Sequence, residues 1–168
     1  MSKILIFGNS GSGKSTLAKK MSTKHNVAHL DLDTIAWQAT LPPTRMPIAD
    51  SEIQLKCFID VNEHWVVEGC YSDLLELVIN KADELIFLNL SIDDCILNAK
   101  NRPWESHKYE SKAAQDANLA MLIEWISQYP ERKDHFSQQA HNQLFNAFTG
   151  KKAMYTSNAY KQQINERM

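Results

Sequence analysis

The sequence predicts an α/β protein with a five-stranded parallel sheet, helices on both faces and one lid segment. Three observations support this fold class. Short apolar runs alternate with helical stretches along the whole chain, a glycine-rich loop follows the first run, and a long polar stretch without apolar periodicity interrupts the second half. With 168 residues, 43% of them hydrophobic, the chain suits a single domain, 1–168, with a sizeable core.

The predicted elements follow from runs of β-branched and apolar residues and from helical periodicity. We expect strands at Lys3–Phe7, Val27–Leu30, His64–Glu68, Glu84–Leu90 and Lys152–Thr156. We expect helices at Lys14–Thr23, Asp50–Val61, Ser72–Lys81, Ile92–Asn101, Ala117–Gln128, Glu131–Phe148 and Ala159–Arg167. The proline-containing stretch Ala39–Pro47 is expected to be a connection.

Composition excludes several classes of protein. A net charge of −2 and dispersed lysines offer no broad surface for nucleic acid, so we expect no nucleic-acid partner. Cys57, Cys70 and Cys95 are odd in number and widely spaced, which argues against a disulfide framework or a zinc site and favours a cytoplasmic location. No stretch approaches about 18 apolar residues, so we expect no membrane span. The oligomeric state cannot be read from the sequence.

The nonapeptide GNSGSGKST matches the phosphate-loop pattern G-x-x-x-x-G-K-[ST]. Glycines let such a loop curl, so that its N–H groups and the following helix form an anion-binding nest. Lys14 is expected to reach the β- and γ-phosphates, and the Ser15 hydroxyl to bind Mg²⁺. The whole loop is predicted to bind nucleotide: Gly8, Asn9, Ser10, Gly11, Ser12, Gly13, Lys14, Ser15 and Thr16.

Two carboxylates lie at the end of the second predicted strand. Asp31 and Asp33 are two residues apart and share one face if the strand continues. One could hold a metal-bound water while the other receives the hydroxyl of a phosphoryl acceptor. The alternative is that both cap the helix that follows, since aspartate is favoured there.

A further carboxylate, Glu68, ends the third predicted strand and is followed by Gly69. We expect Glu68 to bind Mg²⁺ through water, and Gly69 to let a substrate approach the backbone. The alternative is a strand-end glutamate followed by a turn glycine. Trp37 follows the aspartates and either lines an acceptor pocket or belongs to the core.

The polar stretch Pro103–Asp116 is expected to act as a lid, within a lid region of about 102–117; the alternative is an ordinary surface loop. Arg102 opens it, and its planar guanidinium suits phosphate oxygens. Arg132 lies beyond its far side and is either a second lid cation, placed here in the substrate site, or a solvated helix-end charge.

These features together resemble shikimate kinase and its nucleoside-monophosphate-kinase relatives, which have a three-layer P-loop NTPase fold. The resemblance covers nearly the whole chain. The segments HLDLDTIAW (29–37) and WVVEGCYS (65–72) are also similar to small ATPases of the topology-modulation-protein-like group.

The resemblance implies specific roles. By likeness to the D-x-D motif of shikimate kinases, Asp31 would serve Mg²⁺ and Asp33 the acceptor hydroxyl. Arg102 would contact ATP phosphates, and Lys56 stands where those kinases carry an acceptor-binding arginine. The loop after the last strand borders adenine in that family, which makes Ser157 and Asn158 candidates for binding the base.

The leading hypothesis is therefore an ATP- and Mg²⁺-dependent kinase acting on a small-molecule acceptor, whose binding region is about 34–63. Lys14, Asp33 and Arg102 would carry the chemistry. The alternative is a regulatory ATPase or switch, in which ATP orders the lid to present a surface to a protein partner.

Overall fold

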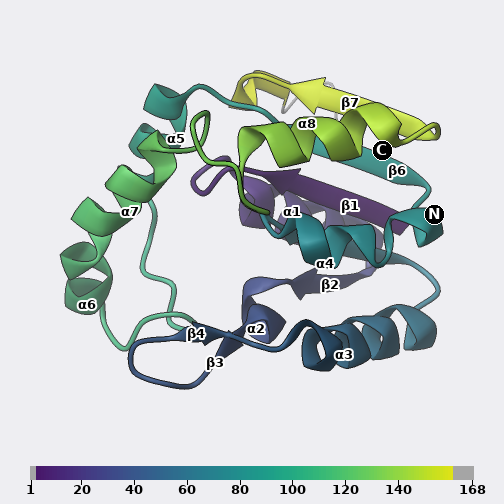
Figure 1. The fold of residues 1–168 in the computed structure, drawn as a ribbon, viewed down its shortest axis with the longest axis horizontal. Coiled ribbons are helices and arrows are strands. Elements are labelled where there is room, and N and C mark those ends of the chain that lie inside the picture. Colours follow the sequence, from purple (N-terminus) through teal and green to yellow (C-terminus); the bar gives the residue numbers. More distant parts are fainter. Residues whose placement is uncertain (1–2, 161–168) are drawn as a thin grey trace.

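Five parallel strands form the central sheet of the computed structural model, which describes residues 3–160 (Figure 1). Their spatial order is β2-β5-β1-β6-β7. The strands are β1 (Lys3–Gly8), β2 (Ala28–Asp31), β5 (Trp65–Gly69), β6 (Glu84–Leu88) and β7 (Lys151–Tyr155). Helices cover both faces, so the predicted fold class is confirmed.

Alternation of side chains along the strands creates the two cores. Ile4 and Ile6 of β1 point to one face, and Leu5 and Phe7 to the other, because successive residues of a strand face opposite sides. The first face is covered by α1 (Lys14–His25), α5 (Ile92–Lys100) and α7 (Leu119–Ser127). The second is covered by α2 (Asp33–Ala36), α3 (Ile48–Val61), α4 (Ser72–Glu76) and α8 (Gln138–Ala147).

The carboxyl ends of the strands meet at one edge of the sheet and bring the motifs together. Asp31 of β2 is paired with Glu68 of β5, and Phe7 of β1 with Gly69. The phosphate loop leaves β1 at this edge, and α6 (Lys112–Ala117) and α7 lie beyond it (Figure 1). In open α/β sheets this edge is where ligands bind.

Several element boundaries differ from the sequence expectation. The stretch Ala39–Pro47, expected as a connection, contains a two-residue strand, β4 (Thr44–Arg45), which pairs antiparallel with β3 (Trp37–Gln38) just before the stretch. The helix expected over Ser72–Lys81 divides into α4 and a 3-10 turn, η1 (Ile79–Lys81). Of the helix expected at Ala159–Arg167, only the end of a second 3-10 turn, η2 (Asn158–Tyr160), falls in the described residues.

The helix expected from Glu131 begins instead at Gln138. Ser137 caps it by accepting a hydrogen bond from the Ala140 N–H at 3.0 Å. Just before it, Asp134 accepts bonds from the Phe136 N–H at 2.9 Å and, through its carbonyl, from the Ser137 hydroxyl at 2.8 Å. Such side-chain to backbone bonds compete with helical bonds, so the helix starts after them.

α8 carries a buried histidine that links three parts of the fold. The His141 side chain is fully buried, with Nδ1 2.6 Å from the Tyr129 hydroxyl oxygen and Nε2 2.8 Å from the Cys70 carbonyl oxygen. A carbonyl only accepts, so Nε2 donates, and Nδ1 accepts from Tyr129. This assignment describes a neutral ring, which is the form expected near pH 7 because burial lowers the pKa of His141 to about 4.

We expect His141 to make folding stability depend on pH. The unfolded chain binds this proton near the ordinary pKa of 6.5 and the folded chain only near 4, so unfolding is favoured as pH falls between these values. The stability is fully present above pH 6.5, and its loss by pH 4 amounts to about 3 kcal/mol. Urea unfolding at about pH 7 and about pH 5 should show a smaller difference for His141→Gln than for the natural chain. His135→Gln, at an exposed histidine, should keep the natural difference; equal slopes in all three proteins would contradict the assignment.

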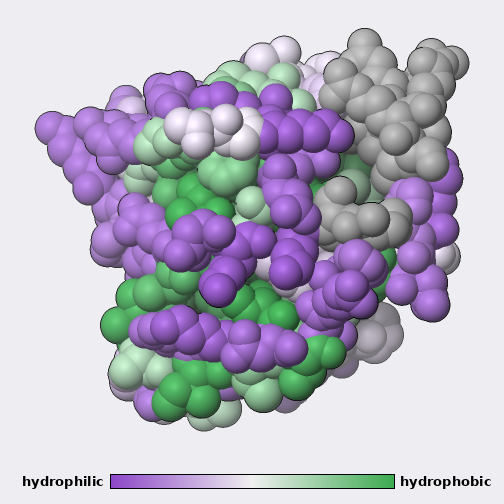
Figure 2. All heavy atoms as spheres, turned by 90° about the vertical axis from the view of Figure 1, so that its right-hand side faces the viewer, coloured by the Kyte–Doolittle hydropathy of each residue, from purple (hydrophilic) through white to green (hydrophobic). Residues whose placement is uncertain are grey.

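The surface opposite α6 and α7 mixes hydrophilic and hydrophobic residues (Figure 2). Among the exposed apolar side chains of α3 are Ile53 and Val61, 69% and 74% exposed. Scattered exposure of this kind is normal for globular proteins. Within residues 3–160, no helix is both long and apolar enough to cross a membrane.

Candidate active site

The phosphate loop joins β1 to α1 through glycines with positive φ. Gly13, at φ 91°, precedes α1, and its carbonyl accepts the first helical bond from the Leu17 N–H at 3.0 Å. Gly11 has φ 76°, and a Cβ there would lie 2.4 Å from the Cys95 carbonyl oxygen. Only glycine suits this conformation and this close approach. The loop therefore opens the N-terminus of α1 toward the edge of the sheet, where anions are favoured.

Two side chains of the first turn of α1 carry the polar chemistry of the loop. Lys14 Nζ donates to the Asn9 carbonyl oxygen at 2.7 Å and lies 3.5 Å from the Ser12 hydroxyl oxygen. The ammonium is thus folded back over the loop. The Ser15 hydroxyl donates to Glu68 Oε1 at 2.8 Å, although 53 residues separate them in the sequence.

Glu68 is almost completely buried at the end of β5, at 1% exposure. Besides the bond from Ser15, its Oε1 lies 3.4 Å from His29 Nε2. On the neighbouring strand, Asp31 stands opposite Glu68 in the sheet register. The three groups expected at a magnesium ion, Ser15, Asp31 and Glu68, are therefore neighbours at one edge of the sheet.

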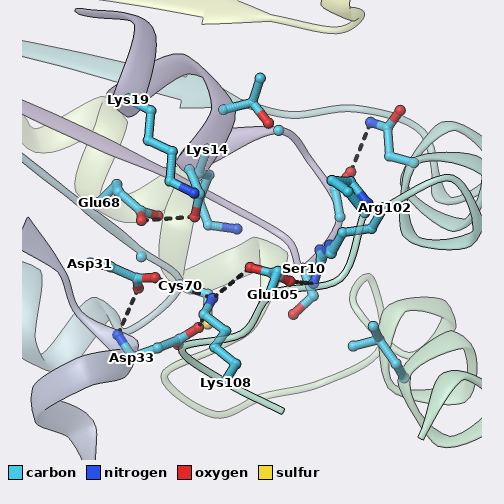
Figure 3. A pocket seen from close by; sticks show the side chains of 18 of the residues that line it. Ser10, Lys14, Lys19, Asp31, Asp33, Glu68, Cys70, Arg102, Glu105 and Lys108 are labelled. Carbon is cyan, nitrogen blue, oxygen red and sulfur yellow. Dashed lines mark hydrogen bonds and ion pairs between the residues drawn. The ribbon is translucent and has the colours of Figure 1, made fainter. Parts of the chain in front are cut away.

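A cavity of about 450 Å³ opens at this edge, between the phosphate loop and the lid segment. Of the residues predicted from the sequence, those lining it are Ser10, Gly11, Gly13, Lys14, Ser15, Thr16, Asp31, Asp33, Glu68, Gly69, Arg102 and Asn158. Figure 3 shows the phosphate-loop lysine, the strand-end carboxylates and the lid residues around it. The residues expected to bind phosphate and those expected to bind an acceptor hydroxyl thus line one cavity.

Asp33 is held by a short chain of hydrogen bonds. The Tyr71 hydroxyl donates to Asp33 Oδ1, and Trp37 Nε1 donates to the Tyr71 oxygen at 2.7 Å. Asp33 Oδ2 accepts from Lys108 Nζ at 2.7 Å. Burial acts to raise the pKa of Asp33, but the Lys108 charge and the Tyr71 hydroxyl outweigh it and lower the pKa. Asp33 is therefore held as the carboxylate.

Asp31 has a different environment. Its Oδ1 accepts the Asp33 N–H at 2.9 Å, and its Oδ2 lies 3.1 Å from Lys108 Nζ. Burial is the largest cause that raises the pKa of Asp31, followed by the charges of Glu68 and Asp33. The N-cap position of α2 is held by Leu32, and neither aspartate caps the helix through its side chain; Asp31 precedes the N-cap and bonds to the N–H of Asp33, the first residue of α2.

The lid segment is braced internally. Arg102 Nη1 donates to Glu105 Oε1 at 3.1 Å, and the Glu105 N–H donates to Gln115 Oε1 at 2.8 Å. Trp104 Nε1 donates to the Tyr109 carbonyl oxygen at 3.0 Å. Arg102, Glu105 and Lys108 all line the cavity, so this segment forms one of its walls.

The loop after β7 contacts the phosphate loop both directly and through Asn98 of α5. Asn98 Nδ2 donates to the Gly11 carbonyl oxygen and to Asn158 Oδ1, both at 2.8 Å. Asn158 Nδ2 in turn donates to the Ser12 carbonyl oxygen at 3.1 Å. Asn158 lines the cavity, whereas Ser157, whose hydroxyl accepts from the Ala159 N–H at 3.3 Å, is not among the lining residues.

Three other candidates for the substrate site lie outside the cavity lining. Lys56 is exposed on α3 and pairs with Glu52, one turn away. Arg132 stacks on Trp125, with its guanidinium carbon 3.7 Å from the ring centroid, and donates to the Trp125 carbonyl. Trp37 is 40% exposed and is joined to the site only through Tyr71, so it is not a core residue. Gly8, Asn9 and Ser12 belong to the phosphate loop but do not line the cavity.

Sequence reasoning missed several wall residues: Lys19, Cys70, Asn98, Asn101, Pro103, Glu105, Lys108, Tyr109 and Leu122. Lys19 and Asn98 lie on α1 and α5, where the apolar periodicity predicts the buried face of each helix but not which polar residue faces the cavity. Cys70 follows Gly69, but burial raises the pKa of its thiol to about 12, so it is not a nucleophile at neutral pH.

The donor set fits a magnesium ion that is completed by phosphate and water. Carboxylate and hydroxyl oxygens are the ligands that this ion prefers, and it is usually bound by one or two carboxylates together with substrate phosphates. Residues 3–160 contain no group of three or more His, Cys, Asp and Glu side chains placed to hold a metal by themselves. Ser15, Asp31 and Glu68 would therefore contribute part of the coordination shell, directly or through water.

Comparison with known proteins supports the fold. No family model matches the chain, and no curated protein is similar enough to be matched. Among solved structures, shikimate kinase from Bacteroides thetaiotaomicron has a TM-score of 0.53 at 15% identity, over 99% of this chain and 94% of that one. Deoxyadenosine kinase from M. mycoides with bound dATP has a TM-score of 0.53 at 15% identity, over 99% and 97%. A sugar kinase from Janibacter sp. has a TM-score of 0.55 at 10% identity, over 98% and 90%.

The chain therefore has the P-loop NTPase fold of the kinase type, as the phosphate loop and the D-x-D motif predict. The three similar structures are kinases that differ in the acceptor for which they are named. At 10–15% identity the likeness concerns the fold, and the acceptor of this chain has to be argued from its own residues.

Proposed function

We propose that this protein transfers the γ-phosphoryl group of ATP to a hydroxyl group of a small molecule. The observation that carries the proposal is that Lys14 and Ser15 of the phosphate loop line the same cavity as Asp33. A nucleotide phosphate and an acceptor hydroxyl could therefore meet there, which is the requirement of phosphoryl transfer.

The loop N–H groups and Lys14 would bind the phosphates, with Lys14 turning from the Asn9 carbonyl to the β- and γ-phosphate oxygens. Ser15, Asp31 and Glu68 would hold Mg²⁺, which supplies charge neutralisation. Asp33 would orient the acceptor hydroxyl and take its proton as the oxygen bonds to the γ-phosphorus and the bond to the β,γ-bridging oxygen breaks, releasing ADP. Arg102 would stabilise the charge on the transferring group once it leaves Glu105.

Tyr71 is an additional positioning residue in this scheme. The pKa of Tyr71 is raised by burial and by neighbouring negative charge, so the hydroxyl keeps its proton and donates a hydrogen bond to Asp33. That bond, together with Trp37 behind it, fixes the direction of the carboxylate toward the cavity. Orientation of a general base in this way contributes to catalysis through positioning.

The second candidate is a regulatory ATPase whose lid acts on a protein partner. The observation that favours it is the position of Lys56 and Arg132, because these two candidates for the substrate site lie outside the cavity lining. An ATPase needs no acceptor clamp, so its nucleotide turnover would respond to a protein and not to metabolites.

One assay separates the two candidates. ADP release with Mg·ATP is measured against hydroxylated metabolites and nucleoside monophosphates, including shikimate and gluconate, with the Lys14→Ala protein as control. Deoxynucleosides and sugars are added because of the similar structures. We expect at least one compound to raise turnover about 100-fold or more over hydrolysis, since an oriented hydroxyl replaces water. A flat response, with ATP binding retained, would contradict the kinase proposal and favour the regulatory ATPase.

A further inference from the structure

The lid residue Lys108 lies among three carboxylates near the carboxyl end of β2. Its Nζ lies 2.7 Å from Asp33 Oδ2, 3.1 Å from Asp31 Oδ2 and 3.5 Å from Glu105 Oε2. The Lys108 side chain is 21% exposed and points into the cavity (Figure 3). It comes from a segment 75 residues away in the sequence, so the contact depends on the closed position of the lid.

The carboxylates require a cation at this place. Asp31, Asp33 and Glu68 gather at one edge of the sheet, and their mutual repulsion contributes to raising the pKa of Asp31. Burial acts to lower the pKa of Lys108, but the charges of Asp33 and Asp31 outweigh it and raise the pKa. Lys108 is therefore a cation, and it neutralises part of the negative charge of Asp31 and Asp33 that would attract a divalent metal.

The same contacts hold the lid to the sheet. In the described part of the chain, the ion pairs that join the lid segment to Asp31 and Asp33 come from Lys108 and, at 4.0 Å from Asp31 Oδ2, from His107. The other polar contacts of the lid described above lie within the segment itself. Removing Lys108 would leave the lid braced internally but weakly attached.

We propose that Lys108 takes the cation position between Asp31 and Asp33, so that lid closure and divalent-metal binding compete for the same carboxylates. The inference rests on the proposed magnesium site. Entry of the metal displaces the Lys108 ammonium, and the lid is released from the end of β2. The freed ammonium then lies at the wall of the cavity that phosphates would occupy, where a cation is favourable.

The test uses the full chain without nucleotide or acceptor. Mn²⁺ replaces Mg²⁺ because both prefer oxygen ligands and free Mn²⁺ can be followed by its electron paramagnetic resonance signal. Lys108→Met keeps an unbranched apolar stem and removes the charge. The matched control is Lys112→Met, a lid lysine that is 52% exposed and pairs with Asp116 at 2.5 Å.

We expect Lys108→Met to bind Mn²⁺ about 10-fold more tightly than the natural chain. This factor corresponds to a natural chain in which the closed state, which competes with the metal, is populated about nine-tenths of the time. Hydrogen exchange of the amides in 104–111 should be roughly 10-fold faster in this variant without metal, because closure slows their exchange. In the natural chain, Mn²⁺ alone should accelerate the same amides, whereas sodium chloride of equal ionic strength should do so much less. Lys112→Met should match the natural chain in both measurements.

Two results would overturn the inference: Mn²⁺ affinity in Lys108→Met equal to that of Lys112→Met, or lid exchange that does not respond to Mn²⁺. Unchanged exchange of the β1 amides shows that the variant is folded, and Lys108→Arg, which keeps the charge, should restore part of the closure. Because no ATP or acceptor is present, the competition can be observed even if the assay for phosphoryl transfer finds no acceptor.

Discussion

Replacing Lys14 by methionine is expected to lower phosphoryl transfer or ATP hydrolysis by about 10³-fold or more. Positioned cations that stabilise the charge of the transferring phosphoryl group have effects of this size. In the structure, Lys14 is the first residue of α1, lines the cavity and is held by the Asn9 carbonyl at 2.7 Å. The ammonium is thus kept within the loop before any phosphate binds.

Lys20→Met is the matched control for this variant. Lys20 is exposed on the same helix and does not line the cavity, so its substitution removes the same charge without touching the site. Single-turnover transfer of labelled γ-phosphate is the measurement, together with thermal unfolding of both variants. Activity in Lys14→Met comparable to that in Lys20→Met would remove the phosphate loop from the proposed mechanism.

The Asp33→Asn variant is expected to bind ATP as the natural chain does but to transfer the phosphoryl group about 10²- to 10⁴-fold more slowly, the range associated with a general base. The amide oxygen of asparagine can still accept the bond from Tyr71, which keeps the side chain in place, although the ion pair of Asp33 with Lys108 is lost. It cannot take the proton of an acceptor hydroxyl, so the defect should appear in the chemical step.

ATP affinity and single-turnover rate are measured separately to distinguish this from a structural role. Asp93→Asn, at an exposed position on α5, serves as the control for loss of a carboxylate. An equal loss of ATP binding and transfer in Asp33→Asn would mean that Asp33 acts by shaping the site. A transfer rate equal to that of Asp93→Asn would exclude Asp33 from the chemistry.

The elements of the fold that have a local pattern of apolar residues or a local motif could be predicted from the sequence. The continuous apolar run Ile4–Phe7 indicates a strand buried on both faces, and the structure places its side chains in two different cores. The phosphate-loop pattern and the strand-end positions of the carboxylates are local features, so the edge of the sheet where they meet could be predicted as well. Boundaries failed where side chains bond to the backbone, as at Ser137 before α8.

The contacts that complete the site could not be predicted, because they join segments far apart in the sequence. Lys108 meets Asp33 across 75 residues, and Tyr71 meets it across 38. The lid sequence has no apolar periodicity that would fix which of its charges faces inward. Arg132 illustrates the converse: its sequence position suggested a substrate ligand, whereas the structure stacks it on Trp125.

The side-chain amide of Asn98 links the phosphate loop to the loop after β7. It bonds to the Gly11 carbonyl in the phosphate loop and to Asn158 after β7, and Asn158 itself holds the Ser12 carbonyl. A shift of the loop after β7 therefore acts on the phosphate loop by two routes, directly through Asn158 and indirectly through Asn98 of α5. The phosphate loop and the loop after β7 thus form one connected unit, so a change in the position of either is transmitted to the other.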